Sequence, residues 1–129
     1  MNSMNSSLIT LGVVVLIIAG IVGISKWSEK KGSVAPTALD SFGQCLADKG
    51  VVMYGAAWCP HCQKEKAAFG GAFKFVKYVE CPEDPKLCLD KGVEKYPTWI
   101  FSGGRKLEGE LGLRGLARES GCPLPAGVK

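Results

Sequence analysis

The apolar and polar positions divide the chain into an uncharged N-terminal stretch and a longer segment of mixed character. Residues 8–24 read LITLGVVVLIIAGIVGI and contain no charged side chain. As a helix, this stretch would extend about 26 Å, close to the hydrocarbon thickness of a bilayer. We therefore expect a single transmembrane anchor over residues 8–25, preceded by a short tail (1–7) and followed by a polar linker (26–36).

A cleaved signal peptide is the main alternative for the uncharged stretch. The chain lacks the basic segment that normally precedes such a signal, and no small-x-small cleavage pattern follows directly after the apolar run. A buried core helix is a further alternative. On orientation, Lys26, Lys30 and Lys31 favour a cytoplasmic domain by the positive-inside tendency, whereas the cysteine content favours the opposite side of the membrane.

From residue 37 onwards, the hydrophobic pattern predicts alternating helices and strands. Thr37 and Asp40 have the spacing of a capping box and open a helix that runs to about Lys49. Apolar or alternating runs predict strands, and runs of helix formers predict helices. The predicted order is helix 37–49, strand 51–54, helix 59–69, strand 73–81, a turn followed by a short helix within 82–91, strands 98–101 and 106–111, and helix 113–120. This order predicts an α/β domain over residues 37–129, with a central mixed sheet flanked by helices.

Length and charge narrow the possible functions. The 129 residues suffice for one domain of ordinary size plus a tail. The net charge is +4, and the lysines are scattered rather than gathered in a stripe. This pattern lacks the electrostatic footprint of a nucleic-acid-binding protein, so we expect no nucleic-acid partner. The run Lys64-Glu65-Lys66 predicts a solvated helix face.

Cys59 and Cys62 stand in the sequence WCPHC, at the predicted junction between a strand and a helix. Unpaired N–H groups and the helix dipole at this position stabilise an anion, so Cys59 is predicted to be the attacking thiolate. Cys62 lies one turn later and can resolve a mixed disulfide. Pro60 fits the first turn, and His61 can add a positive charge or a hydrogen bond that stabilises the reduced form. The redox group is then the cysteine pair itself, without a bound cofactor.

A zinc site is the strongest alternative use of these cysteines. The spacing C-x2-C-x18-C-x6-C runs through Cys59, Cys62, Cys81 and Cys88, and its first gap is typical of a zinc ribbon. The second gap is too wide for a zinc knuckle and the neighbouring strand is apolar, so we expect no metal. A static disulfide across only two intervening residues would be strained, which disfavours a purely structural role for the first pair.

The remaining four cysteines are predicted to form structural disulfides. Cys81 and Cys88 bracket a short loop, and Cys45 and Cys122 could tie the two ends of the domain together. Free buried cysteines are the alternative. Six cysteines, an even number, in about 100 residues favour an oxidising compartment. We give this more weight than the three lysines, and expect the domain on the extracytoplasmic side of the membrane.

Tyr96 and Pro97 open a predicted strand, where proline is unusual because it cannot donate to the hydrogen-bond ladder. A plain turn proline is the alternative. Together with WCPHC, this segment resembles the thioredoxin superfamily, in which a cis-proline loop faces the redox cysteines. The resemblance implies a thioredoxin-like fold, a cis Tyr96–Pro97 bond beside Cys59, and backbone groups that bind an extended substrate. Trp58 is expected to be a partly exposed flank of this site.

Four blocks of sequence narrow the resemblance. They read MYGAAWCPHCQKEKAAFG, YVECPEDPKLC, YPTWIF and LEGELGLRGLARESGC. The combination is similar to the thioredoxin-like domains found with bacterial and plant homologues of vitamin K epoxide reductase. This resemblance implies a protein disulfide oxidoreductase that moves electrons between protein thiol or disulfide substrates and a quinone-linked membrane oxidoreductase. Because only one membrane span is predicted here, that partner would be a separate protein.

The chain departs from the thioredoxin pattern at Met53. Ordinary thioredoxins place a buried aspartate there, six residues before the first active cysteine. The proton of the resolving thiol must therefore go to another group, and Glu80 or water are the candidates. This departure favours the oxidase direction over fast general reduction. The alternative function is a binding or assembly module, or a metal-binding protein, on the same scaffold and without turnover.

Overall fold

The computed structural model describes residues 37–128, so the predicted tail (1–7), anchor (8–25) and linker (26–36) all lie outside the described residues. Within residues 37–128, no helix is long and apolar enough to cross a bilayer. The elements are α2 (Ala38–Asp48), β1 (Val52–Gly55), α3 (Pro60–Phe69), the 3-10 helix η1 (Gly70–Phe75), β2 (Lys77–Glu80), α4 (Pro85–Asp90), β3 (Thr98–Ile100), β4 (Lys106–Glu108) and α5 (Gly112–Ser120).

The strands of the described region form one mixed sheet in the order β2-β1-β3-β4. β1 and β2 are parallel, with Met53 opposite Tyr78, whereas β3 is antiparallel to both of its neighbours. Parallel neighbours need a crossover connection, and α3 with η1 supplies it. The predicted α/β architecture with a central mixed sheet is therefore confirmed.

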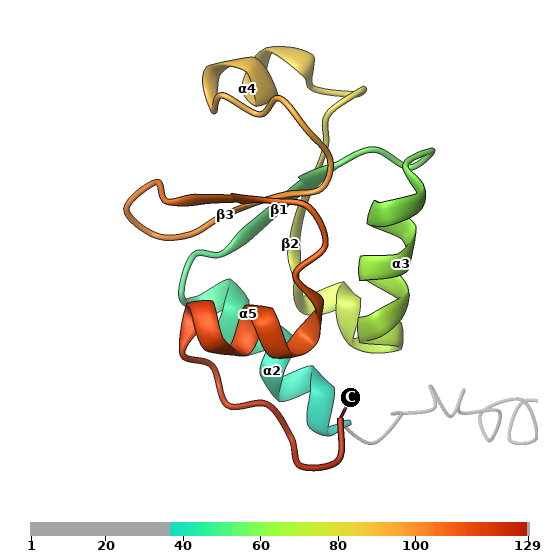
Figure 1. Cartoon of the computed structure of the whole chain (residues 1–129), viewed down its shortest axis with the longest axis vertical. Helices are drawn as coiled ribbons and strands as arrows, with labels where there is room; N and C mark the ends of the chain where they lie inside the picture. The colour runs from blue at the N-terminus through green and yellow to red at the C-terminus, as the bar shows by residue number, and fades with distance from the viewer. Residues whose placement is uncertain (1–36, 129) are drawn as a thin grey trace, which may run out of the picture. The chain divides into compact units, whose positions relative to one another are not determined.

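The two faces of the sheet are covered by different helices (Figure 1). α2, α3 and α5 pack on the face that carries Met53 and Trp99, and both of these side chains are fully buried. The smaller cluster on the opposite face joins Tyr54 of β1 to Cys81 and Cys88, the second of which lies on α4. The larger core holds α3 against the sheet and so determines where the N-terminus of α3 lies.

α2 begins at the capping box that the sequence predicts. The N–H of Asp40 donates to the Thr37 hydroxyl at 3.2 Å, and the N–H of Thr37 donates back to the Asp40 carboxylate at 2.9 Å. The Thr37 hydroxyl also donates to the Asp40 carboxylate, at 2.7 Å, and the two bonds that the carboxylate accepts from Thr37 lower the pKa of Asp40. The start of α2 is therefore set by two residues that are only three positions apart in the sequence.

The strand predicted over residues 73–81 starts later than expected, at Lys77, because the preceding residues form η1. Gly70 ends α3 with a positive φ of 54°. The ring of Phe73 then packs edge to face on Phe69, with ring centroids 5.9 Å apart. The alternation of apolar residues predicted a strand from Phe73. Residues 70–75 instead form a 3-10 helix, because Phe73 packs against the end of α3.

Gly43 lies at a close approach between α2 and η1. A Cβ at Gly43 would lie 2.9 Å from the carbonyl oxygen of Ala72 and 3.3 Å from the Cβ of Phe75. A Cβ at Gly71, in contrast, would meet no atom within 4 Å. The contact between α2 and η1 therefore depends on the missing side chain of Gly43.

We predict that Gly43→Val lowers the free energy of unfolding by roughly 2 kcal/mol, because the added side chain overpacks the contact between α2 and η1. Gly71→Val is the matched control and should change this free energy by less than about 0.5 kcal/mol. Urea denaturation with the disulfides intact measures both. Equal midpoints for the two variants would contradict the packing described here.

Candidate active site

Cys59 lies where the loop after β1 enters α3. Its backbone is extended, with φ −78° and ψ 118°, and its side chain caps the helix. Pro60 occupies the first turn, where no N–H donor is needed and where the fixed φ of proline suits a helix. The sulfur of Cys59 is therefore held at the positive end of the α3 dipole.

The two sulfurs of the pair have different surroundings. The backbone N–H of Cys62 donates to Sγ of Cys59 at 3.3 Å, which favours negative charge on Cys59. Cys62 is fully buried, and this burial, together with the hydrogen bond between its thiol and Cys59, raises the pKa of Cys62 to about 12. Cys62 therefore keeps its proton. Cys59 is also buried, at 4% exposed, but its sulfur lies at the start of α3 and accepts a backbone N–H there. This arrangement suits Cys59 as the nucleophile and Cys62 as the resolving thiol.

The Tyr96–Pro97 peptide bond is cis, and Pro97 is buried directly before β3. The carbonyl oxygen of Pro97 accepts a hydrogen bond from the N–H of Gly109 at 2.7 Å, so this oxygen is used within the domain. The rings of Tyr96 and Trp58 meet edge to face, with centroids 6.0 Å apart. This contact places the proline loop beside the residue that precedes Cys59.

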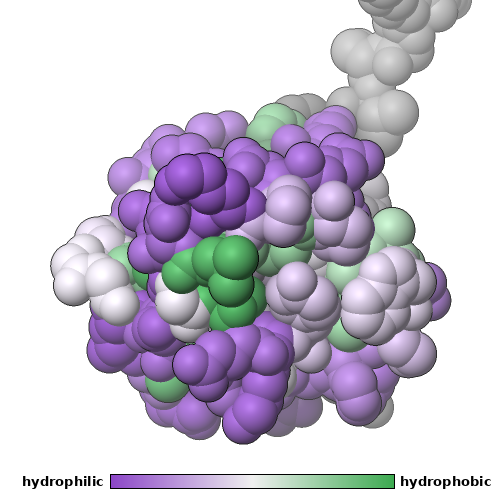
Figure 2. Space-filling view, turned by 90° about the horizontal axis from the view of Figure 1, so that it is seen from above, coloured by the Kyte–Doolittle hydropathy of each residue, from purple (hydrophilic) through white to green (hydrophobic). Residues whose placement is uncertain are grey.

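Trp58 is one of two large apolar side chains that are well exposed in the described residues, with 69% of its surface accessible; the other is Leu89 on α4. Seen from the α4 end, the surface of the domain is largely hydrophilic, with a small apolar patch near the centre of the view (Figure 2). Trp58 is thus more exposed than the sequence predicts. The indole therefore presents an exposed apolar surface at the residue that precedes Cys59.

His61 contacts a carboxylate rather than a cysteine. Its Nδ1 bonds to Glu110, and Nζ of Lys64 lies 2.6 Å from the other oxygen of the same carboxylate. Lys64 and His61 lower the pKa of Glu110, and Glu110 raises the pKa of Lys64. An influence of His61 on Cys59 would therefore act through charge. The sequence pattern does not reveal Glu110, because it lies 49 positions away in the segment before α5.

Glu65 is buried, although its neighbours predict a solvated helix face. It is 2% exposed, and its carboxylate accepts the N–H of Gly112 at 3.1 Å. α5 has no side-chain cap of its own, so Glu65 serves the unpaired N–H groups at its start. Burial raises the pKa of Glu65, and the bonds from Gly112 and Leu111 partly offset this effect. The flanking lysines concealed this role in the sequence.

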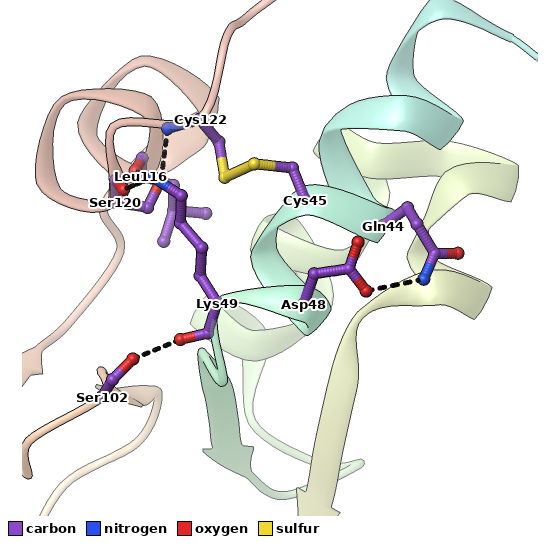
Figure 3. The surroundings of a disulfide bond; sticks show 8 residues. All are labelled: Gln44, Cys45, Asp48, Lys49, Ser102, Leu116, Ser120 and Cys122. Atoms are coloured by element: carbon purple, nitrogen blue, oxygen red, sulfur yellow. Dashed lines mark hydrogen bonds between the residues drawn. A yellow bond between two sulfur atoms is a disulfide. The ribbon is translucent and has the colours of Figure 1, made fainter.

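Four cysteines form two disulfides. Cys81–Cys88 closes a short loop, and Cys45 on α2 is joined to Cys122, which follows α5 (Figure 3). The N–H of Cys122 also donates to the hydroxyl of Ser120 at 3.1 Å, which orders the same junction. In the chain-entropy model, the longer loop contributes about 4 kcal/mol to stability and the shorter one about 2 kcal/mol.

Cys59 and Cys62 are the cysteines of the described domain that are available for thiol–disulfide exchange. All six cysteines of the chain lie in the described region, and these two alone are free thiols there. The disulfide between Cys81 and Cys88 is incompatible with the zinc alternative, which needs both as thiolates. Among residues 37–128, no cluster of three or more His, Cys, Asp or Glu side chains is arranged to hold a metal ion.

The cysteine pair at a helix start, with Trp58 in contact with the cis-proline loop of a mixed-sheet domain, can be compared with known families. The family model described as Thioredoxin matches residues 33–117. The chain belongs to the thioredoxin family. Its superfamily assignment from the sequence motifs is therefore confirmed.

Two relatives of this thioredoxin-family chain have names that describe disulfide exchange. The chain is 38% identical over 106 residues to Thiol-disulfide oxidoreductase LTO1 of Arabidopsis thaliana, covering 75% of this chain and 28% of that protein. It is 33% identical over 87 residues to Protein disulfide-isomerase A5 of Bos taurus, covering 58% of this chain and 17% of that protein. The chain thus spans less than a third of either relative, and both names agree with the predicted enzyme class.

A solved structure, oxidized glutaredoxin 2 from Chlamydomonas reinhardtii, is a weaker match to this thioredoxin-family chain. The TM-score is 0.40 at 23% sequence identity, and the match covers 67% of this chain and 95% of that one.

The difference between the two thiols predicts selective alkylation. Because Cys62 is buried with a pKa of about 12, iodoacetamide at about pH 8 should modify Cys59 of the reduced pair at least about tenfold faster than Cys62. Peptide mapping by mass spectrometry measures this, after mild reduction that leaves both structural disulfides intact. In the control variant Cys59→Ser, Cys62 should stay unmodified until denaturant is added. Preferential labelling of Cys62 would contradict the assignment.

Proposed function

We propose that this chain is a thiol–disulfide oxidoreductase that exchanges disulfides with protein substrates through Cys59 and Cys62. One observation carries the proposal: these are the two free cysteines of the described domain, and they share the start of α3 beside the cis-proline loop. The other four cysteines are held in disulfides and do not compete. The names of the relatives support the same activity.

The exchange proceeds in two steps that balance in atoms and electrons. In the reducing direction, the Cys59 thiolate attacks a substrate disulfide, forms a mixed disulfide and releases one substrate thiolate. Cys62 then loses its proton and attacks Sγ of Cys59, which releases the second substrate thiolate and leaves the Cys59–Cys62 disulfide. Oxidation of a substrate dithiol is the reverse sequence. We favour the oxidising direction, because Met53 is buried where an acid would assist a reductase.

Trp58, Tyr96 and Pro97 are the proposed substrate-binding residues. The two aromatic rings are in contact, and Trp58 is open to solvent. Pro97 has no N–H, and its carbonyl is bonded to Gly109. Main-chain pairing with an extended substrate at this loop is therefore assigned to Tyr96.

We further propose that residues 8–25 anchor the domain in a membrane, with the domain on the extracytoplasmic side. The uncharged stretch supports the anchor, and two structural disulfides suit an oxidising compartment. The proposed electron partner is a separate, quinone-linked membrane oxidoreductase, on the basis of the four sequence blocks. An anchor would raise the effective concentration of the domain at that partner.

Substrate trapping tests the exchange chemistry. We predict that Cys62→Ser accumulates mixed disulfides with a disulfide-bonded test protein such as insulin, because the resolving thiol is gone. The double variant Cys59→Ser/Cys62→Ser should accumulate none, and Cys59→Ser should have no insulin-reducing activity. Non-reducing gels and a turbidity assay measure these outcomes. Turnover that survives in Cys59→Ser, or tight metal binding without turnover, would favour a binding module instead.

Thiol labelling of intact cells tests the location. After mild reduction, a membrane-impermeant maleimide should modify Cys59 of the full chain, since the domain is proposed to face outward. A permeant maleimide gives the total accessible thiol for comparison. Modification by the permeant reagent alone would place the domain in the cytoplasm.

A further inference from the structure

The resolving cysteine has a proton-transfer problem that β1 does not solve. Cys62 must lose a proton before it attacks Cys59, yet burial raises its pKa to about 12. Ordinary thioredoxins have a buried aspartate at position 53, which could accept this proton. Here position 53 is a methionine, fully buried in the main core. A titratable group must therefore reach Cys62 from another element.

β2 brings a phenol to the buried sulfur. A Cβ placed on Gly55 would lie 2.8 Å from Sγ of Cys62 and 3.4 Å from the hydroxyl of Tyr78. The thiol and the phenol thus flank the same backbone position, which is open because residue 55 has no side chain. The parallel register of β1 with β2 sets this arrangement, since Gly55 pairs with Glu80 and Met53 with Tyr78.

The Tyr78 hydroxyl is itself bonded to a carboxylate. It donates to Oε2 of Glu80 at 2.5 Å, and Oε1 of Glu80 accepts the N–H of Ala57 at 2.8 Å. Ala57 lies in the loop that leads to Cys59, so the carboxylate is tied to the active-site backbone. Burial and the bond to Glu80 raise the pKa of Tyr78, so the phenol keeps its own proton and is suited to pass one on.

The other charged group on this side is Lys66 of α3. Its Nζ lies 3.5 Å from the centroid of the Tyr78 ring, and its charge lowers the pKa of Cys62 in opposition to burial. The titratable groups around Cys62 are therefore Cys59 and Lys66 from α3, and Tyr78 and Glu80 from β2. Glu80 is the one carboxylate among them.

We propose that Glu80, acting through the hydroxyl of Tyr78, accepts the proton of Cys62 in the resolving step and returns it in the reverse direction. The proton of Cys62 moves to Oη of Tyr78 as the phenolic proton moves to Oε2 of Glu80. The sulfur electron pair forms the bond to Sγ of Cys59, and the electron pair of the mixed disulfide leaves on the substrate sulfur. This inference rests on the proposed exchange activity.

The test is a single-turnover reaction of the reduced, full chain with glutathione disulfide. Acid quenching and mass spectrometry separate formation of the mixed disulfide at Cys59 from its resolution by Cys62. In Tyr78→Phe and Glu80→Gln, resolution at about pH 7 should slow by about 100-fold, a typical effect of losing general acid–base assistance. Formation of the mixed disulfide should keep its rate.

The pH profile separates a relay from a structural role. Between about pH 6 and about pH 9, resolution in the unaltered chain should change little, because the relay takes the proton without hydroxide. In both variants hydroxide must remove the proton, and the rate should rise about tenfold per pH unit. The variants should approach the unaltered chain at high pH, which a misfolded site would not do.

Two matched controls accompany these variants. Tyr54→Phe removes a phenol that packs on the opposite face of the sheet, and Glu83→Gln removes an exposed carboxylate just after β2. Both should resolve the mixed disulfide like the unaltered chain.

The outcomes distinguish the relay from the exchange activity. If the unaltered chain forms no mixed disulfide, the proposed function fails. If it turns over and Tyr78→Phe resolves at the unaltered rate with the unaltered pH profile, the relay alone is overturned. Tyr78→Phe decides this even if Glu80→Gln disturbs the loop at Ala57, because phenylalanine keeps the ring and loses only the hydroxyl.

Discussion

The close packing of the Cys62 sulfur against Gly55 is the contact on which the rest of the site depends. A side chain at position 55 would overlap this sulfur, so the end of β1 and the first turn of α3 can meet only at a glycine. The contact buries Cys62, which keeps the thiol protonated, and it leaves the Cys62 N–H directed at Sγ of Cys59. The chemical difference between two cysteines only three positions apart follows from this one approach.

The other four cysteines of the domain form two disulfides. The Cys45–Cys122 bridge ties α2 to the segment after α5, and the Cys81–Cys88 bridge holds the turn that follows β2. Cysteines held in these two bridges are not free thiols, so Cys59 and Cys62 are the free pair of the described domain. Glu80 immediately precedes Cys81, so the Cys81–Cys88 bridge lies next to the backbone that carries the proposed proton acceptor.

Charged groups around α3 fall into three separate environments. Glu110 binds His61 and Lys64 near the surface, Glu65 lies buried where it caps α5, and Glu80 accepts the hydroxyl of Tyr78, which lies with the Cys62 sulfur beside Gly55. Each carboxylate is bonded to a different part of the domain. In the proposed relay, Glu80 of β2 takes the role that a buried aspartate at position 53 has in ordinary thioredoxins. The domain can therefore carry methionine at that position.

The sequence predicted the order of helices and strands, the cap at Thr37 and the helix start at Cys59. Each of these features depends on residues within a few positions of one another. The motifs also located the proline loop. In contrast, Glu110 meets His61 across 49 positions, Glu65 meets Gly112 across 47, and Glu80 meets Ala57 across 23. Such pairs depend on how α3 is placed against β2 and α5, and only the packing of the buried core decides that placement. The same packing turned the apolar run at Phe73 into a 3-10 helix and buried a glutamate between two lysines.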